Sequence, residues 1–237
     1  MKRMFLFYGV LFLLLNCEDS KKQPATTAKE SVVTKSDSTV KKAKKTIAER
    51  TYALPLLNEH NADSLLLEYG KQNPETKAVI NTSFGEIHLE LFNETPVHRA
   101  NFVYLAKHAY YNDTFFHRVV PNFIIQAGSS DNASTNKKRA KIGKYRLSAE
   151  LKSGRKHTRG TLSGAKHYRE NPDKKSAAYE FFIFLGPDKS TGHLNGNYTI
   201  FGKVTKGMDV VDTIANLDSD EGEWPLSNVY ISVSVIE

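Results

Sequence analysis

The chain has 237 residues, of which 40% are hydrophobic, and this is enough for one folded domain with a substantial core plus additional segments. The formal net charge of +7 is concentrated, because residues 137–175 contain 14 lysines and arginines against three acidic residues, a local +11 that leaves −4 for the remainder. The single cysteine, Cys17, excludes an intramolecular disulfide and leaves no cysteine for catalysis or metal binding beyond residue 17.

The first 17 residues, MKRMFLFYGVLFLLLNC, have the pattern of a secretory signal peptide. Two basic residues precede eleven apolar or small residues at positions 5–15, a run shorter than the roughly 20 residues that span a bilayer. The final LLNC resembles a bacterial lipoprotein box, which implies that Cys17 becomes the lipid-attached first residue. We therefore expect a lipid-anchored protein outside the cytoplasm, at the periplasmic face of a bacterial membrane or in the outer membrane. A plain signal peptide with an incidental cysteine is the alternative.

Residues 18–52 are predicted to be a flexible linker, since they are polar, charged and almost free of aromatic side chains and cannot bury enough apolar area to order themselves. Residues 53–75 differ, because leucines and a tyrosine recur among polar residues. Asn61 or Asp63 is a candidate N-cap, and Pro74 ends the pattern. We expect a helical extension here that packs on the following domain, residues 76–237.

The domain opens with residues 78–81 and 86–92, whose alternating apolar and polar side chains predict a hairpin with one wet face. Thr95 and Pro96 then form a helix start, and apolar residues at 102, 105, 106 and 109 predict one buried helical face.

The central stretch, residues 115–128, reads FFHRVVPNFIIQAG and places Arg118 between two strand-like runs separated by a Pro-Asn turn. Period-two alternation puts Ile124 and Gln126 on one face of the second run. These side chains, with Arg118 and Phe123, can border one cleft. An isolated stretch of this kind is also compatible with an ordinary buried hairpin and a solvated arginine.

The remainder alternates polar segments with short strands. Residues 129–159 have little periodicity and are expected to be mainly surface loop, and their basic residues a solvated face, with binding of lipid headgroups or acidic clients as the alternative. No aromatic residues interleave with the basic ones in a nucleic-acid-binding motif, so no nucleic-acid partner is expected. Further strands are predicted at 161–163, 180–185, 200–204 and 229–235, and a helix at 208–215.

Four blocks in this order resemble the cyclophilin-type peptidyl-prolyl cis-trans isomerases: FHRVVPNFIIQAG, GTLS followed by an alanine, EFFI, and LNG leading into IFGKV. The resemblance covers residues 75–237 and implies a mainly β fold, a closed eight-stranded antiparallel barrel capped by two α-helices. It also implies an enzyme that accelerates X-Pro rotation in proline-containing polypeptides during protein folding. The predicted signal peptide implies that this folding takes place outside the cytoplasm. No bond is made or broken in that rotation, so neither a cofactor nor a metal is expected.

The resemblance assigns Arg118 as the catalytic residue, because a guanidinium donor stabilises the twisted amide more than the planar one. The proline ring needs a small apolar pocket beside it. The positions that match the family's substrate-binding residues are Phe123, Ile124, Gln126, Ala165, Glu180, Phe182, Leu194 and Tyr198.

Several positions depart from the family pattern. Glu180 stands where glutamine is usual, and its carboxylate can pair with Arg118 and compete with substrate. Lys166 and His167 replace Asn-Ala, which predicts an altered neighbouring groove, and His193 replaces a tryptophan that contributes to cyclosporin binding. Glu180 and the Lys166-His167 segment leave an alternative function open, a non-enzymatic proline-peptide-binding or chaperone module on the same barrel. A closed barrel without long exposed edges gives no reason to expect more than a monomer.

Overall fold

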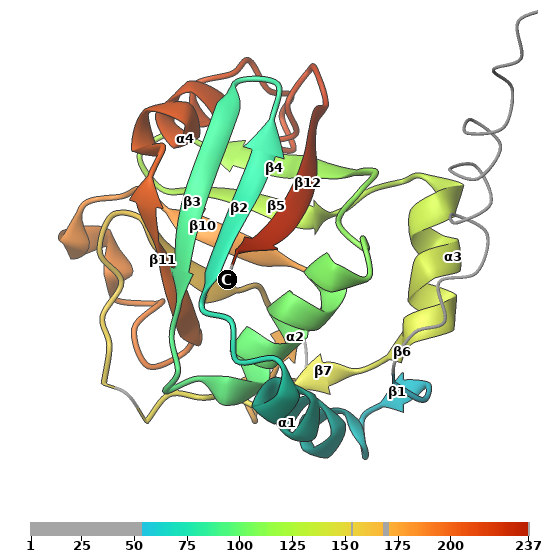
Figure 1. Ribbon diagram of the computed structural model, residues 1–237. Coiled ribbons are helices and arrows are strands. Elements are labelled where there is room, and N and C mark those ends of the chain that lie inside the picture. The colour runs from blue at the N-terminus through green and yellow to red at the C-terminus, as the bar shows by residue number, and fades with distance from the viewer. Residues whose placement is uncertain (1–53, 153, 168–170, 237) are drawn as a thin grey trace, which may run out of the picture. The chain divides into compact units, whose positions relative to one another are not determined.

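The computed structural model describes residues 54–152, 154–167 and 171–236. Eight strands in this part of the chain close into a barrel in the order β10-β5-β4-β12-β2-β3-β11-β8 (Figure 1). Every neighbouring pair is antiparallel, which confirms the predicted architecture. The strands are β2 (Lys77–Thr82), β3 (Gly85–Leu91), β4 (Thr114–Val120), β5 (Ile124–Ser129), β8 (Thr161–Gly164), β10 (Phe181–Phe184), β11 (Ile200–Lys206) and β12 (Val229–Ile236).

Alternating side chains fill the barrel as the sequence pattern predicts. Ile87, Leu89 and Leu91 of β3 are buried, and the residues between them are more exposed. The interior is strongly aromatic: the ring of Phe102 lies 5.6 Å from that of Phe181 and 5.2 Å from that of Tyr111. Such edge-to-face and tilted contacts stabilise a core beyond the burial of apolar area.

The two predicted helices, α2 (Pro96–Lys107) and α4 (Met208–Ala215), are present and lie toward opposite ends of the barrel (Figure 1). α2 begins with Thr95 and Pro96, yet the Thr95 side chain makes no capping hydrogen bond to the helix. Glu150 caps the helix instead, since its carboxylate accepts hydrogen bonds from the backbone N–H groups of Val97 and His98, both at 3.0 Å.

The N-terminal extension contains the predicted helix, α1 (Ala62–Gln72), which packs against α2. Before it, β1 (Leu57–Asn58) pairs in parallel with β6 (Gly143–Lys144). The two backbones approach so closely that a Cβ at Gly143 would lie 1.9 Å from the carbonyl oxygen of Leu57, and its φ is +136°. Only glycine fits at this position, so the extension is built into the fold.

Arg99 of α2 binds the C-terminal end of α1 through hydrogen bonds. Its guanidinium donates hydrogen bonds to the carbonyl oxygens of Gly70, Asn73 and Glu75, at 3.2, 3.0 and 3.3 Å. The last carbonyls of a helix lack partners within the helix, and a buried cation satisfies them. Burial lowers the pKa of Arg99, and the charges of Glu75 and Glu150 oppose this shift.

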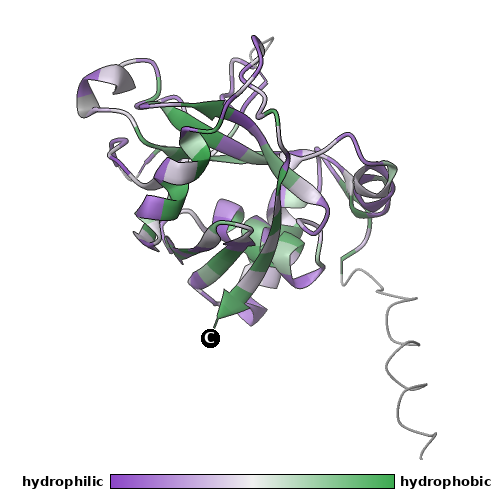
Figure 2. Ribbon diagram, turned by 90° about the horizontal axis from the view of Figure 1, so that it is seen from above, coloured by the Kyte–Doolittle hydropathy of each residue, from purple (hydrophilic) through white to green (hydrophobic). Residues whose placement is uncertain are grey.

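The expectation of a loop over residues 129–159 is wrong at its centre, where α3 (Ala133–Ile142) forms a helix. α3 is mostly polar (Figure 2) and has no wide apolar stripe. Basic side chains hold it to the barrel instead. Lys138 Nζ donates to the carbonyl of Ala109 at 3.1 Å, and Arg139 Nε donates to the Tyr110 hydroxyl at 2.9 Å. Periodicity did not reveal this helix because its attachment is not hydrophobic.

Two short strands complete the fold, β7 (Arg146–Leu147) and β9 (Ser176–Ala177), together with a 3-10 helix at Asp188–Thr191. The predicted signal peptide, Cys17 and the linker lie outside the described residues. Among the residues that are described, no helix is long and apolar enough to cross a bilayer.

Candidate functional site

A pocket opens between β4, β5, β8 and β10 and the segment at 194–198. β4 supplies Arg118, which faces Gln126 of β5 in the strand register, and Gln126 in turn faces Phe182 of β10. Eight of the nine predicted catalytic and substrate-binding residues line it, and only Glu180 does not. The lining residues are Arg118, Phe123, Ile124, Gln126, Ala165, Lys166, Phe182, Leu194 and Tyr198.

The floor of this pocket is a small apolar cluster that is separate from the barrel core. It consists of Ile124, Ala165, Phe182, Phe184 and Leu194, with Val120, Phe123 and Tyr198 packed against it. The rings of Phe182 and Tyr198 meet edge to face at 5.6 Å. An apolar floor with rigid aromatic walls can shield a small ring from water.

His157 packs against this apolar floor, and the sequence pattern did not identify His157 as part of the site. Its ring stacks on that of Phe182 at 6.0 Å with an angle of 7° between the planes. Asn195 Oδ1 accepts from both the backbone N–H and Nδ1 of His157, at 2.8 and 2.9 Å. Nδ1 therefore carries the proton, and Nε2 accepts from the Ser163 hydroxyl at 3.1 Å. Burial lowers the pKa of His157, so the neutral ring is favoured.

Arg118 lies at the polar edge of the pocket with its side chain 29% exposed. Its Nε donates to Glu223 Oε2 at 2.5 Å, and Glu223 comes from the loop between α4 and β12. Among the described residues, the two terminal nitrogens of the guanidinium have no hydrogen-bond or ion-pair partner. Nothing in the sequence motifs pointed to Glu223.

Glu180 does not pair with Arg118, contrary to the prediction. Its carboxylate accepts a hydrogen bond from Gln126 Nε2 at 3.0 Å and lies 3.7 Å from His117 Nε2 and 3.9 Å from Arg139. Burial lowers the pKa of His117, and the charge of Glu180 opposes this shift. Glu180 therefore holds the side-chain amide of Gln126 in place. It makes no ion pair with the Arg118 guanidinium, which is paired with Glu223.

Two of the residues that depart from the family pattern, Lys166 and His193, contact aromatic rings at or beside the pocket. Lys166 Nζ donates to the carbonyl of Asn197 at 2.8 Å and lies 4.3 Å from the centre of the Tyr198 ring. Lys166 also lines the pocket. The sequence had indicated only that the neighbouring groove is altered at this position. The ring of His193 lies 5.6 Å from that of Phe123, at the outer wall.

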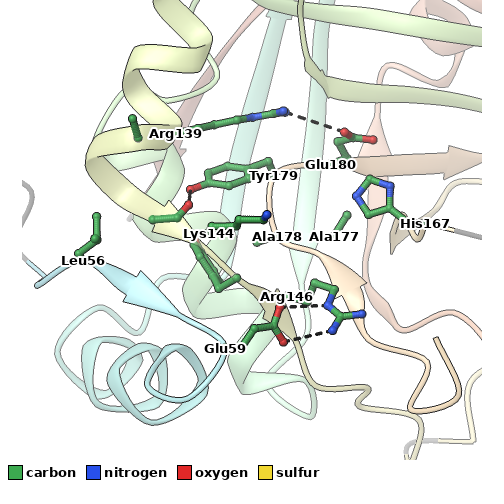
Figure 3. A pocket seen from close by; sticks show the side chains of 13 residues that line it. Leu56, Glu59, Arg139, Lys144, Arg146, His167, Ala177, Ala178, Tyr179 and Glu180 are labelled. Atoms are coloured by element: carbon green, nitrogen blue, oxygen red, sulfur yellow. Dashed lines mark hydrogen bonds and ion pairs between the residues drawn. The ribbon is translucent and has the colours of Figure 1, made fainter. Parts of the chain in front are cut away.

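A second cavity of about 570 Å³ has Glu180 in its wall (Figure 3). The extension forms part of its wall, and Glu59 there accepts a hydrogen bond from Arg146 at 3.0 Å and pairs with Lys175 at 3.2 Å. At the opposite wall the guanidinium of Arg139 points toward Glu180 (Figure 3). The cavity is lined by Leu56, Glu59, Arg139, Ala140, Gly143, Lys144, Tyr145, Arg146, His167, Ala177, Ala178, Tyr179 and Glu180.

Titratable groups in the described part of the chain form no cluster of three or more His, Cys, Asp or Glu side chains that could hold a metal ion. The pocket itself places the Arg118 guanidinium beside an apolar floor.

Known proteins resemble this chain over the barrel. A sequence model described as cyclophilin type peptidyl-prolyl cis-trans isomerase/CLD matches residues 77–235. A peptidyl-prolyl cis-trans isomerase of Acinetobacter baylyi is 41% identical over 145 residues, 60% of this chain and 73% of that protein. A peptidyl-prolyl cis-trans isomerase-like 1 of Aspergillus fumigatus is 36% identical over 158 residues, 66% of this chain and 92% of that protein.

Among solved structures, a cyclophilin-type peptidyl-prolyl cis-trans isomerase of Cryptosporidium parvum, crystallised in the presence of the dipeptide Ala-Pro, is similar with a TM-score of 0.56. It is 28% identical, and the match covers 68% of this chain and 99% of that one. The family match, these relatives and the barrel agree, and the chain belongs to the cyclophilin-type peptidyl-prolyl cis-trans isomerases.

Proposed function

We propose that the pocket at Arg118 is where this isomerase binds and rotates X-Pro bonds of client polypeptides. The observation that carries the proposal is the placement of the Arg118 guanidinium at the edge of an apolar floor formed around Phe182 and Leu194. Its terminal nitrogens have no partner within the described residues. The proline ring occupies that floor. Crystallisation of the Cryptosporidium relative in the presence of Ala-Pro supports a proline-containing peptide as the ligand.

The chemistry needs preferential binding of the twisted amide. Rotation about the peptide bond has a barrier of roughly 20 kcal/mol, since the amide loses its conjugation. Each tenfold acceleration requires about 1.4 kcal/mol of preference for the twisted form over the planar one. As the amide twists, its nitrogen recovers a lone pair. A donor from Arg118 to this nitrogen, or to the carbonyl of the same unit, supplies that preference.

Replacement of Arg118 by alanine tests this assignment. Catalysed isomerisation of a proline-containing tetrapeptide, measured in a protease-coupled assay, should fall by at least about tenfold while the thermal unfolding profile is kept. Arg118→Lys is the matched variant, because it keeps the charge and loses the planar fork. An unchanged rate in Arg118→Ala would remove this residue from the mechanism.

A non-enzymatic peptide-binding module on the same barrel is the second candidate. It is favoured by one observation, namely that two polar groups of the pocket are already engaged by carboxylates, Arg118 by Glu223 and Gln126 by Glu180. The same assay separates the two functions. A protein that binds the tetrapeptide without accelerating its isomerisation would be the module.

We further propose that the enzyme acts outside the cytoplasm, held to a bacterial membrane by lipid on Cys17. The support is the sequence: a basic start, a short apolar run and a sole cysteine at its end. Two or more acyl chains give stable membrane attachment. The Cys17→Ser variant should leave the membrane fraction, and a variant that still sediments with membranes would disprove the anchor.

The isomerase is also proposed to work as a monomer, because the closed barrel leaves none of its eight strands with a free edge. Light scattering on the purified chain tests this, and a stable dimer mass would contradict it.

A further inference from the structure

The loop between α4 and β12 is built to present Glu223 to Arg118. The backbone N–H of Val119, next to Arg118 on β4, donates to the Glu223 carbonyl at 2.8 Å. Asp220 shapes the turn before it, since its carboxylate accepts from the backbone N–H groups of Gly222 and Trp224 at 2.8 and 2.9 Å. The loop is thus docked on the strand that carries the arginine.

Two further features show that this placement is enforced. Glu223 has a φ of +64°, in the left-handed region that side chains other than glycine rarely adopt. The next residue, Trp224, packs its ring edge to face on that of Phe115 at 5.3 Å. Strained backbone that is over-determined by its surroundings is typical of functional positions.

The geometry of the ion pair leaves the reactive part of the guanidinium available. Glu223 takes only Nε, at 2.5 Å, and the two terminal nitrogens have no partner in the described part of the chain. A bond at Nε restricts rotation of the planar group about the side chain, while the terminal N–H groups stay available at the pocket edge.

Gln126 is the other residue close enough to orient Arg118, since the two face each other across β4 and β5. Its amide nitrogen is directed to Glu180, and no hydrogen bond joins it to Arg118 among the described residues. The carboxylate of Glu223 is therefore the group that holds the guanidinium.

We propose that Glu223 is a positioning residue for isomerisation: it fixes the plane of the Arg118 guanidinium so that its terminal nitrogens meet the twisted amide. This inference rests on the proposed role of Arg118. A positioned donor needs little reorganisation as the amide twists, so the effect belongs to the transition state and appears in kcat. A carboxylate that merely competed with substrate would have the opposite effect, because its removal would raise the rate.

Glu223→Ala in the full chain tests the proposal with a proline tetrapeptide. We expect kcat to fall about fivefold to tenfold with KM within about twofold of wild type. Glu223→Gln keeps an acceptor oxygen for Nε and should recover most of kcat. The matched control is Glu221→Ala, an exposed carboxylate of the same loop with no hydrogen-bond or ion-pair partner among the described residues, which should behave as wild type.

A double-mutant cycle distinguishes the catalytic role of Arg118 from the positioning role of Glu223. In the Arg118→Ala background, Glu223→Ala should have no further effect on kcat, because the group that it positions is gone. If Arg118→Ala alone is harmless, the proposed function fails. If Arg118→Ala is severe and Glu223→Ala is neutral or activating, only the positioning role fails.

A measurement on the wild-type protein covers the case in which the Glu223 variants do not fold. The Nε–H proton of Arg118, assigned by its loss in Arg118→Lys, should exchange with water at least about tenfold more slowly than that of an exposed arginine. Exchange at the rate of a free side chain would overturn the proposal.

Discussion

Replacing His157 with phenylalanine should destabilise the protein by about 2–4 kcal/mol near neutral pH. His157 is almost fully buried, and its side chain bonds Ser163 and Asn195. The fully buried Ser163 hydroxyl has no other partner in the described part of the chain, and an orphaned buried hydroxyl costs about 1–3 kcal/mol. Loss of the bond to Asn195 adds about 1 kcal/mol, since that oxygen still accepts the backbone N–H of residue 157.

The loss of stability caused by His157→Phe should be smaller at acidic pH. The pKa of His157 in the folded protein lies below its ordinary value of 6.5, chiefly because the ring is buried. As the pH falls through that ordinary value, the unfolded chain binds a proton that the folded chain does not, so the wild type loses stability. The phenylalanine variant has no titrating side chain at position 157, so it does not lose stability in this way. His117 shifts in the same direction in both proteins and cancels from the difference.

Urea unfolding followed by fluorescence of Trp224, the single tryptophan, measures the difference at about pH 7.5 and about pH 5.5. Adding Ser163→Ala to His157→Phe is the matched control, because it removes the orphaned hydroxyl and should restore about 1–2 kcal/mol. A cost below about 1 kcal/mol, or one that grows on acidification, would refute the assigned hydrogen bonds and the neutral ring.

Two other substitutions test the extension and the pocket edge. Arg99→Met removes three hydrogen bonds to the end of α1 and leaves one buried and two partly buried carbonyls without this donor, so urea unfolding should show a loss of about 3 kcal/mol. A loss below about 1 kcal/mol would contradict this attachment. Glu180→Gln keeps an acceptor for Gln126 and leaves Arg118 paired with Glu223, so kcat/KM should stay within about threefold of wild type, whereas a larger rise would show that Glu180 competes with substrate after all.

The barrel and the residues that line the pocket were accessible from the sequence for a physical reason. Strands such as β3 and β12 bury every second side chain, so their period-two pattern is local and readable. α4 has a clear apolar stripe and was predicted with its observed bounds. The pocket residues fall in short ordered motifs, so their proximity followed from the family resemblance.

The features that were missed depend on contacts between distant segments. Glu223 and Arg118 are 105 residues apart, and the acidic loop contains no motif that indicates its partner. His157 lies in a polar, basic segment and reveals its burial only when the chain is folded. α3 was read as a loop because Lys138 and Arg139 attach it through hydrogen bonds, which leave no periodic signal.

The polar edge of the pocket is organised by two carboxylates, and their exposure determines what each does. A carboxylate holds a donor more firmly than a neutral acceptor does, but its charge also weakens the positive field of a catalytic guanidinium. Glu223 is 42% exposed, so water screens its charge while its hydrogen bond to Arg118 persists. Glu180 is only 18% exposed, but it accepts a hydrogen bond from Gln126, and the Arg139 guanidinium 3.9 Å away opposes its charge. We therefore expect orientation to outweigh the loss of positive field at Arg118, so that Glu223 holds the donor beside the apolar floor.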